Sequence, residues 1–259
     1  MISDKAFVHP DAKLGANVEV GPFAYIDKNV EIGDGSLIMA HASVLSGARI
    51  GRNVRVFPNA VISGIPQDLK FRGEETTAVI GDNTTIRECA TVNRGTASKG
   101  TTIVGSDCLI MAYSHIAHDC NLANHIIIGN ASQIAGEVEI ADWAILSGNV
   151  LVHQFSRIGA HVIIQGGSRV GKDVPPYVTA GRDPLAYVGL NLVGLRRRSY
   201  TSEQIREIQD IYRYIYQSGL NTTQALNKII EEVSDSVEKN TIVDFIKASQ
   251  RGIIRGCFE

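Results

Sequence analysis

A branched aliphatic residue returns at every sixth position over most of the chain. Counted in steps of six from Val8 to Val170, 25 of the 28 positions are Val, Ile or Leu. An α-helix repeats every 3.6 residues and a half-buried strand every two, so a period of six requires a coil of repeated short strands and turns. The pattern predicts a parallel β-helix built from hexapeptides.

Small or β-branched residues form a second register, four places after the aliphatic residues. Examples are Ala24, Ala42, Cys108, Ser132 and Ala144. This register and the next aliphatic residue are two positions apart and share a strand face, so both point into the core. If three hexads make one triangular turn, residues 18 apart stack about 4.8 Å apart along the axis.

The outward positions, sorted into columns 18 residues apart, differ between the three sides. One column is apolar and consists of Leu109, Ile127, Ile145 and Ile163. The second consists of His115, Gln133, Leu151 and Arg169, and the third of Asn121, Glu139 and Arg157. An outward apolar stripe favours closed self-association. We therefore expect a homotrimer with clefts between neighbouring coils; the alternative is that the C-terminal segment of the same chain covers the stripe.

Two stretches interrupt the repeat, near residues 63–79 and 94–102. In the first, Asp68 and Glu74 occupy positions that should be aliphatic. Breaks in a repeat are common places for functional insertions. The polar residues Gln67, Asp68, Lys70 and Arg72 favour a binding loop over a tolerated surface insertion.

The repeat ends after Val170, and the Asp-Val-Pro-Pro sequence at residues 173–176 stops strand pairing. We expect a linker through Asn191 and the arginine run 196–198, then helices over residues 201–218, 222–233 and 241–250. The predicted fold is mainly β, with a hexapeptide-repeat β-helix over residues 1–190 and a C-terminal α-helical domain over residues 191–259.

Composition excludes several classes of function. The 259 residues carry a net charge of −2, which gives no general reason to expect nucleic-acid or membrane binding. No apolar run is long enough to cross a bilayer, and the chain opens directly into the repeat without a signal peptide. Four cysteines without paired spacing indicate reduced thiols. We therefore expect a cytoplasmic protein.

Five of the seven histidines lie in the second half of the coil: His115, His118, His125, His153 and His161. Column arithmetic places Gly136 one coil above His118 and Gln154 two coils above it. In the same way Glu137 lies above Asp119. These residues and His153 therefore form one outward polar cluster at a corner of the prism.

A histidine beside a carboxylate is the usual general base near neutral pH. His118 and Asp119 fit this role if the corner turn brings neighbouring side chains to one side, and the Gly136 N–H is then open to an oxyanion. No Ser or Cys is presented as a nucleophile, so direct attack by a substrate hydroxyl or amine is the simplest mechanism. Three alternatives remain: surface histidines with structural hydrogen bonds, a zinc site as in hexapeptide-coil carbonic anhydrases, and a non-catalytic scaffold.

Several motifs are more specific than the hexad. They are QDLK (67–70), NRGT (93–96), HIAHDC (115–120), VHQF (152–155), IGAHV (158–162), DVPPY (173–177), GLRRR (194–198) and RGIIR (251–255). In this order, and over essentially the whole chain, the sequence resembles the acyl-[acyl-carrier-protein]:UDP-N-acetylglucosamine O-acyltransferase family. Members of that family make the first acylation of lipid A biosynthesis.

The resemblance implies a left-handed coil, a homotrimer and no cofactor or metal. It implies transfer of an (R)-3-hydroxyacyl group from acyl carrier protein to the 3-hydroxyl of UDP-N-acetylglucosamine. His118 would be the general base, Asp119 would orient it, and the Gly136 N–H would stabilise the oxyanion.

The same resemblance implies a set of substrate-binding residues. These are Gln67, Asp68 and Lys70 for the sugar and its phosphates, His115, Glu137 and His153 in the pocket, Gln154, Asn191, Arg197 and Arg198 for the nucleotide, and Gly166 in the acyl groove. Gly166 falls in a column on the apolar side, away from His118. The two can share one ligand only across a subunit boundary, which the expected trimer supplies.

Three positions depart from the family pattern. Glu137 and Pro184 stand where histidines are usual, and Val193 stands where a glutamate is expected. The sequence therefore leaves open whether the acceptor carries a 3-hydroxyl or a 3-amine, how long the acyl chain is and where acyl carrier protein docks. Glycine at position 166 leaves the groove open and favours a long acyl chain.

Overall fold

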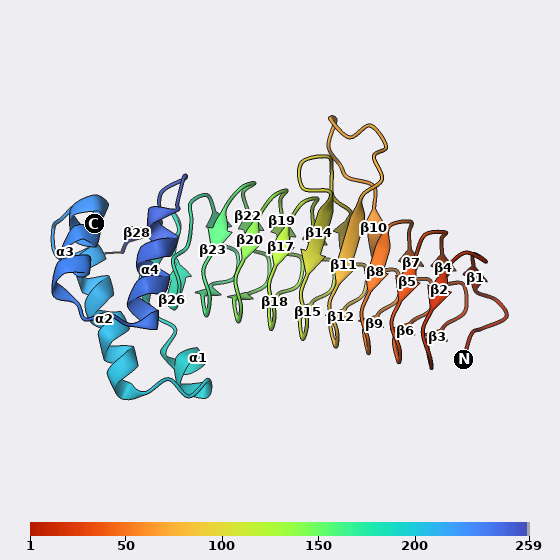
Figure 1. Ribbon diagram of the computed structural model, residues 1–259, viewed down its shortest axis with the longest axis horizontal. Coiled ribbons are helices and arrows are strands. Elements are labelled where there is room, and N and C mark those ends of the chain that lie inside the picture. The colour runs from red at the N-terminus through yellow and green to blue at the C-terminus, as the bar shows by residue number, and fades with distance from the viewer. Residues whose placement is uncertain (258–259) are drawn as a thin grey trace.

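Three sheets of very short strands, parallel except for one pair near the C-terminal end, form the sides of a long prism, and the C-terminal helices cover one end of it (Figure 1). The computed structural model describes residues 1–257. The first sheet contains β1 (Phe7–Val8), β4 (Tyr25–Ile26), β7 (Ser43–Val44), β10 (Val61–Gly64), β13 (Thr91–Asn93), β16 (His115–Ile116), β19 (Gln133–Ile134), β22 (Leu151–Val152) and β25 (Arg169–Val170).

The second sheet contains β2 (Lys13–Leu14), β5 (Glu31–Ile32), β8 (Ala48–Ile50), β11 (Thr77–Ile80), β14 (Thr101–Val104), β17 (Asn121–Leu122), β20 (Glu139–Ile140) and β23 (Arg157–Ile158). The third sheet contains β3 (Glu19–Val20), β6 (Leu37–Ile38), β9 (Arg55–Val56), β12 (Thr85–Ile86), β15 (Leu109–Ile110), β18 (Ile127–Ile128), β21 (Ile145–Leu146), β24 (Ile163–Ile164), β26 (Val178–Gly181), β27 (Ala186–Leu190) and β28 (Arg255–Gly256).

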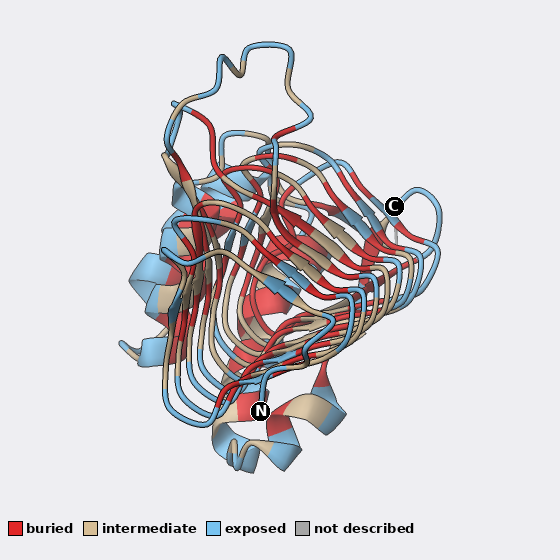
Figure 2. Ribbon diagram, turned by 90° about the vertical axis from the view of Figure 1, so that its right-hand side faces the viewer, coloured by how far each residue is buried: buried red, intermediate tan, exposed pale blue. Residues whose placement is uncertain are grey.

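Both predicted inward registers lie in the core. Ile116 and Ile134 of the aliphatic register are fully buried, and so are Ala144 and Ser132 of the small register. Figure 2 looks along the coil and shows buried residues along its three sides, with exposed residues gathered at the turns. The sequence-based prediction of a parallel β-helix of hexapeptide repeats followed by a helical region is confirmed.

The strand register confirms the outward columns. His115 pairs with Gln133, which pairs with Leu151, each 18 positions further on. The apolar column lies on the third sheet, where its four side chains are only partly buried: Leu109, Ile127, Ile145 and Ile163.

The two interruptions preserve the hexad frame because they lengthen the coil by whole hexads. Val61 pairs with Thr91, 30 positions later instead of 18. Thr77 pairs with Thr101, 24 positions later instead of 18. Both extra segments leave the prism between the first and second sheets, where Figure 1 shows two loops standing off the coil near β10, β11 and β14.

The helical region is formed by α1 (Leu192–Arg197), α2 (Ser202–Gln217), α3 (Thr222–Glu232) and α4 (Val237–Lys247). The expected linker through the arginine run was wrong, because the Asn191 side chain accepts from Gly194 N and caps a short helix. The last helix also begins earlier than expected, because Ser236 caps it by accepting from Lys239 N.

The helices pack on the end of the coil through buried tyrosines. The Tyr212 hydroxyl donates to the Pro176 carbonyl at 2.6 Å, and Tyr187 stacks on Tyr216 with ring centroids 4.6 Å apart. Strand β28 returns to pair with β27, which ties the C-terminal segment back to the third sheet. The boundary between a β-helix domain (residues 1–190) and an α-helical domain (residues 191–259) stays a prediction. Residues 258 and 259 of the α-helical domain lie outside the described residues.

Candidate active site

His118 and Asp119 lie in the turn that joins β16 to β17, in a corner formed by residues 117–120, 135–138 and 153–156. We call this the His118 corner. Asp119 adopts a left-handed conformation with φ of 60°, so its side chain turns to the same side as its neighbour. His118 Nδ1 lies 2.8 Å from Asp119 Oδ2. The sequence alone could not fix this contact, since neighbouring strand residues normally point in opposite directions.

Asp119 is fully buried and receives three further hydrogen bonds. The Thr96 N–H and hydroxyl donate to its two oxygens at 2.9 and 2.6 Å, and the Lys99 N–H donates at 3.2 Å. Burial opposes ionisation, but the bonds from Thr96, His118 and Lys99 outweigh it and hold the pKa of Asp119 below its ordinary value. An ionised Asp119 accepts a hydrogen bond from Nδ1–H of His118, and this tautomer leaves Nε2 free to take a proton from a substrate.

Gly136 packs flat against the His118 ring from the next coil. A Cβ at position 136 would lie 2.7 Å from both Cε1 and Nε2 of His118, so no other residue fits there without moving the imidazole. Within residues 1–257 the Gly136 N–H donates no hydrogen bond. A free N–H beside the base can hold a developing negative charge on oxygen.

A groove of about 550 Å³ opens in front of this pair. Its floor is the outward column of the first sheet, and its lining includes Gln67, His115, Ala117, His118, Gln133, Ala135, Gly136, Leu151, His153, Gln154, Arg169 and Gly171. The structure thus brings together six of the residues expected from the sequence: Gln67, His115, His118, Gly136, His153 and Gln154.

The first loop, residues 65–76, reaches back over His118. The Asp68 carboxylate lies 3.7 Å from His118 Nε2 and accepts from Lys70 N at 2.8 Å. Arg94 holds the loop in place, because its guanidinium lies 5.4 Å above the Phe71 ring. The Lys70 side chain is exposed and does not line the groove.

His115 is held in a neutral, fixed state beside the base. Its Nδ1 lies 2.7 Å from the Thr91 hydroxyl. Burial, followed by the neighbouring His118, lowers the pKa of His115 below its ordinary value. A neutral imidazole of this kind offers hydrogen bonds to a ligand without adding charge.

Besides Asp68, Lys70 and Asp119, five further expected residues do not line the groove. Glu137 is half-buried and accepts from the Ser98 hydroxyl at 3.1 Å. Gly166 lies at a different corner, where an added Cβ would meet the Gly148 carbonyl at 3.1 Å. The remaining three are Asn191, Arg197 and Arg198, which belong to α1 and its caps.

The environment of Arg198 resembles a prepared anion site. Its guanidinium lies 4.7 Å above the Trp143 ring, and its Nε and one terminal nitrogen are buried without a partner in the described part of the chain. Burial lowers its pKa below the ordinary value. Asn191 donates to the His161 carbonyl at 2.9 Å and so fixes α1 against the coil.

The sequence did not assign a site role to several residues that support this chemistry. Thr96 and Lys99 lie in an insertion, where the hexad gives no register, and only the NRGT motif marked Thr96 as notable. Trp143 lies at a turn position that many residue types fill. Arg169 was placed in the same outward column as His115 from the sequence, and the structure adds that it lines the groove.

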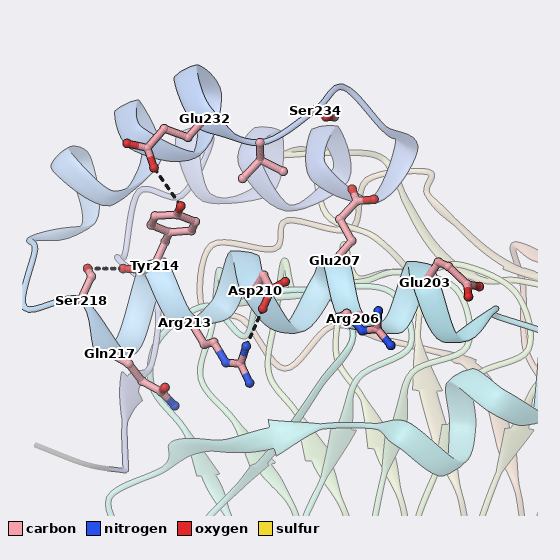
Figure 3. A pocket seen from close by; sticks show the side chains of 11 residues that line it. Glu203, Arg206, Glu207, Asp210, Arg213, Tyr214, Gln217, Ser218, Glu232 and Ser234 are labelled. Atoms are coloured by element: carbon pink, nitrogen blue, oxygen red, sulfur yellow. Dashed lines mark hydrogen bonds and ion pairs between the residues drawn. The ribbon is translucent and has the colours of Figure 1, made fainter.

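A second groove lies in the helical region, between α2 and the segment that includes the end of α3 (Figure 3). Its polar side chains satisfy one another: Tyr214 donates to Glu232 at 2.8 Å and Arg213 to Asp210 at 2.6 Å. It holds none of the residues expected from the sequence.

Among residues 1–257, no three or more His, Cys, Asp or Glu side chains are grouped closely enough to ligate a metal. No helix in the same range is both long and apolar enough to cross a bilayer.

The fold and the site together define a class. The fold is a hexapeptide coil, and its site combines a histidine–carboxylate pair with a free N–H beside an outward groove. These features are those of a hexapeptide-repeat acyltransferase. Residues 29–64 match the bacterial transferase hexapeptide family, and residues 173–254 match the second domain of UDP-N-acetylglucosamine O-acyltransferases.

Full-length comparisons go further. The chain is 53% identical over 252 residues to the acyl-[acyl-carrier-protein]–UDP-N-acetylglucosamine O-acyltransferase of Chlorobaculum parvum, covering 97% of this chain and 96% of the relative. It superposes on the UDP-N-acetylglucosamine acyltransferase of Bacteroides fragilis with a TM-score of 0.97 at 58% identity, covering 98% of this chain and 100% of that one. For the Francisella novicida enzyme the TM-score is 0.96 at 41% identity, with 99% and 95% coverage.

The chain therefore belongs to the UDP-N-acetylglucosamine O-acyltransferase family, as the sequence motifs predicted. The predicted acyltransferase activity is confirmed with it, and the carbonic anhydrase and scaffold alternatives fall away.

Proposed function

We propose that this chain transfers an (R)-3-hydroxyacyl group from acyl carrier protein to the 3-hydroxyl of UDP-N-acetylglucosamine, at the start of lipid A biosynthesis. The observation that carries the proposal is the His118–Asp119 pair with the unpartnered Gly136 N–H stacked on it. The proposed substrates place the reaction in the cytoplasm.

The chemistry follows from this geometry. His118 Nε2 removes the proton of the acceptor hydroxyl, and the hydroxyl oxygen attacks the thioester carbonyl carbon. The carbonyl oxygen becomes negative and accepts from Gly136 N–H. The C–S bond then breaks, and the protonated His118 returns its proton to the departing thiol of the carrier.

The acceptor sugar is proposed to lie between the groove and the first loop, with Asp68, Gln67 and Lys70 on one side and His115, Glu137 and His153 on the other. Gln154 extends the groove towards the nucleotide. Arg198 stacks on Trp143 and Asn191 bonds to His161, both at the corner between the second and third sheets. Asn191, Arg197 and Arg198 are therefore proposed to serve the site of a neighbouring chain. Arginine suits a diphosphate because it presents several charged donors in a fixed plane.

We therefore propose a homotrimer in which α1 of one chain completes the groove of its neighbour. The apolar column Leu109, Ile127, Ile145 and Ile163 would supply the contact between coils. Gly166 lies beside that column and would open the acyl groove at the same boundary, which favours a long 3-hydroxyacyl chain.

The carrier protein is acidic, and the coil end offers a basic surface to it. A third cavity, of about 610 Å³, shares Arg169 and Gly171 with the groove and adds the cations Lys172, Arg182 and Arg255 beside one carboxylate, Asp183. A positive surface beside the groove would guide an acidic partner and its acyl group to the base.

One experiment tests the reaction. Purified protein is incubated with a mixed pool of acyl carrier protein thioesters and, in parallel reactions, with UDP-N-acetylglucosamine or its 3-amino analogue, and the product is identified by mass spectrometry. We expect an ester of a long 3-hydroxyacyl chain. A product formed only with a UDP-3-amino sugar, or preference for the shortest donor in the pool, would overturn the acceptor or chain-length part respectively, and absence of any acylated sugar would overturn the whole.

A mixing experiment tests the shared site. His118→Ala and Arg198→Ala chains are co-expressed, and mass is measured by light scattering. If each site combines His118 of one chain with Arg198 of another, a mixed trimer contains an intact site although each parent trimer has none. We therefore expect activity to return in the co-expressed mixture. Monomers, or mixed trimers as inactive as the parents, would contradict the shared site.

A further inference from the structure

The shorter insertion, residues 94–100, contacts the buried carboxylate of Asp119 and does not line the groove. Thr96 donates its N–H to Asp119 Oδ1 at 2.9 Å and its hydroxyl to Asp119 Oδ2 at 2.6 Å. Lys99 N donates to Oδ1 at 3.2 Å. One threonine therefore binds both carboxylate oxygens, which prevents the carboxylate from turning about its Cβ–Cγ bond.

The insertion is itself held rigidly on both sides. Gly95 N donates to the Thr77 carbonyl at 3.0 Å, and the Thr76 hydroxyl donates to the Gly95 carbonyl at 2.6 Å. An added Cβ at Gly95 would lie 2.2 Å from Thr101 N, so the close approach requires glycine. On the other side Ser98 donates to Glu137 in the next coil.

The position of His118 depends on this clamp. Asp119 Oδ2 is shared between the Thr96 hydroxyl at 2.6 Å and His118 Nδ1 at 2.8 Å. Any rotation of the carboxylate would therefore move the imidazole relative to Gly136 and the groove. Charge-assisted hydrogen bonds to a fully buried carboxylate are among the strong ones in a protein.

We infer that Thr96 is a positioning residue for the His118–Asp119 pair, and that the insertion at residues 94–100 serves to supply it. The inference rests on the proposed function, in which His118 is the base. The short insertion would thus affect kcat by holding the catalytic pair in position. The longer loop acts elsewhere, because its Asp68 lies near Nε2 of His118, the atom that would face the substrate.

Three single variants test it: Thr96→Val, Thr96→Ser and Thr101→Val. Thr96→Val removes the hydroxyl and keeps the shape, and we expect kcat to fall about 10- to 100-fold with KM for UDP-N-acetylglucosamine little changed. Thr96→Ser restores the hydroxyl and should restore most of kcat. Thr101→Val is the matched control, because its hydroxyl accepts from Thr77 at 2.9 Å and does not touch Asp119.

A double-mutant cycle separates positioning from general stability. In an Asp119→Ala background the hydroxyl of Thr96 has no carboxylate to hold, so Thr96→Val should cost little further activity. If Thr96→Val does not fold, Thr96→Ala takes its place, since it removes the same hydroxyl, with the bond that this hydroxyl accepts from Ser98 N, and adds no branched side chain.

Equal kcat in Thr96→Val and Thr101→Val would overturn the inference, and so would an undiminished effect of Thr96→Val in the Asp119→Ala background. Failure of the proposed function would give a different result. In that case His118→Ala would keep full turnover, independently of the activity of the Thr96 variants.

Discussion

Two corners of the same prism use one backbone turn for opposite purposes. The Asp82 corner lies between the second and third sheets and includes residues 15–18, 33–36, 51–54, 81–84, 105–108, 123–126 and 141–144. At four of these turns the N–H at the second turn position donates to a side chain 18 or, across an insertion, 30 positions later. The bonds join Ala16 to Asp34, Arg52 to Asp82, Ser106 to Asn124 and Asn124 to Asp142, at 2.7–2.9 Å.

At the His118 corner the equivalent donor stays open. The Gly136 N–H has no acceptor within the described residues, and the residue 18 positions later is Gln154, which lines the groove. The turn is the same, but glycine replaces the capped residue and an imidazole lies against it. What distinguishes the His118 corner is the set of groups beside the open N–H: a glycine without a Cβ, an imidazole packed against it and a buried carboxylate that holds the imidazole.

The insertions follow the same division. Both insertions leave the coil at the corner between the first and second sheets, and both precede His118 in the sequence. The shorter one supplies hydrogen-bond donors to Asp119. The Asp82 corner carries no insertion among the described residues. Extra chain is therefore found where it can contact the base or its carboxylate.

Removing the base should produce the largest difference between the corners. We expect His118→Ala to lower kcat about 1,000-fold, because general-base catalysis is lost, while the unfolding midpoint and the assembly stay unchanged. The control is His9→Ala, which alters a histidine in the turn between β1 and β2, far along the coil from the groove. Steady-state turnover with UDP-N-acetylglucosamine and an acyl carrier protein thioester measures both; retained activity in His118→Ala would mean that another group is the base.

Filling the open turn should have the next largest effect. Gly136→Ala places a methyl group 2.7 Å from two ring atoms of His118 and must displace the imidazole. We expect kcat to fall about 10- to 100-fold, since small misplacements of a catalytic group have large effects on rate. Gly64→Ala serves as control because its nearest neighbour would be at an ordinary 3.8 Å. If the two variants lose equal activity, the packing of Gly136 on His118 has no special role.

The buried carboxylate should give the His118 corner its own pH dependence of stability. The pKa of Asp119 is held below the ordinary value of 3.8 by its hydrogen bonds, so its ionised form stabilises the fold above that pH. This contribution is lost as pH falls from about 3.8 through the folded-state pKa. We expect the unfolding free energies of wild type and Asp119→Asn, measured by denaturant titration, to differ near neutral pH and to converge below that range. A difference that persists at low pH would show that the hydrogen bonds do not depend on charge.

Breaking a cap at the Asp82 corner should have the smallest effect. Asp82→Ala leaves Arg52 N without its acceptor at 2.7 Å, and we expect a loss of at most about 1 kcal/mol of stability with kcat unchanged. Hydrogen exchange of the Arg52 amide should accelerate. A loss of turnover instead would show that the two corners are coupled.

Much of the fold could be predicted because it depends on period alone. Ile116 and Ser132 could be assigned to the core because a period of six and an inward face determine their direction. The frame survived both insertions, because each adds whole hexads. The helix boundaries were harder, since single capping residues such as Asn191 and Ser236 decide where α1 and α4 begin.

The site divides in the same way. By itself the sequence determined that His118, Gly136 and Gln154 stack at one corner and that Gly166 lies at another, because an 18-residue turn fixes every position of the coil relative to the others. Only the tertiary structure decided that Asp119 turns back to its neighbour, that Thr96 clamps it and that Arg198 lies over Trp143. Those contacts depend on a left-handed turn, an insertion without register and a helix end, and none of these has a period from which a side-chain position can be calculated.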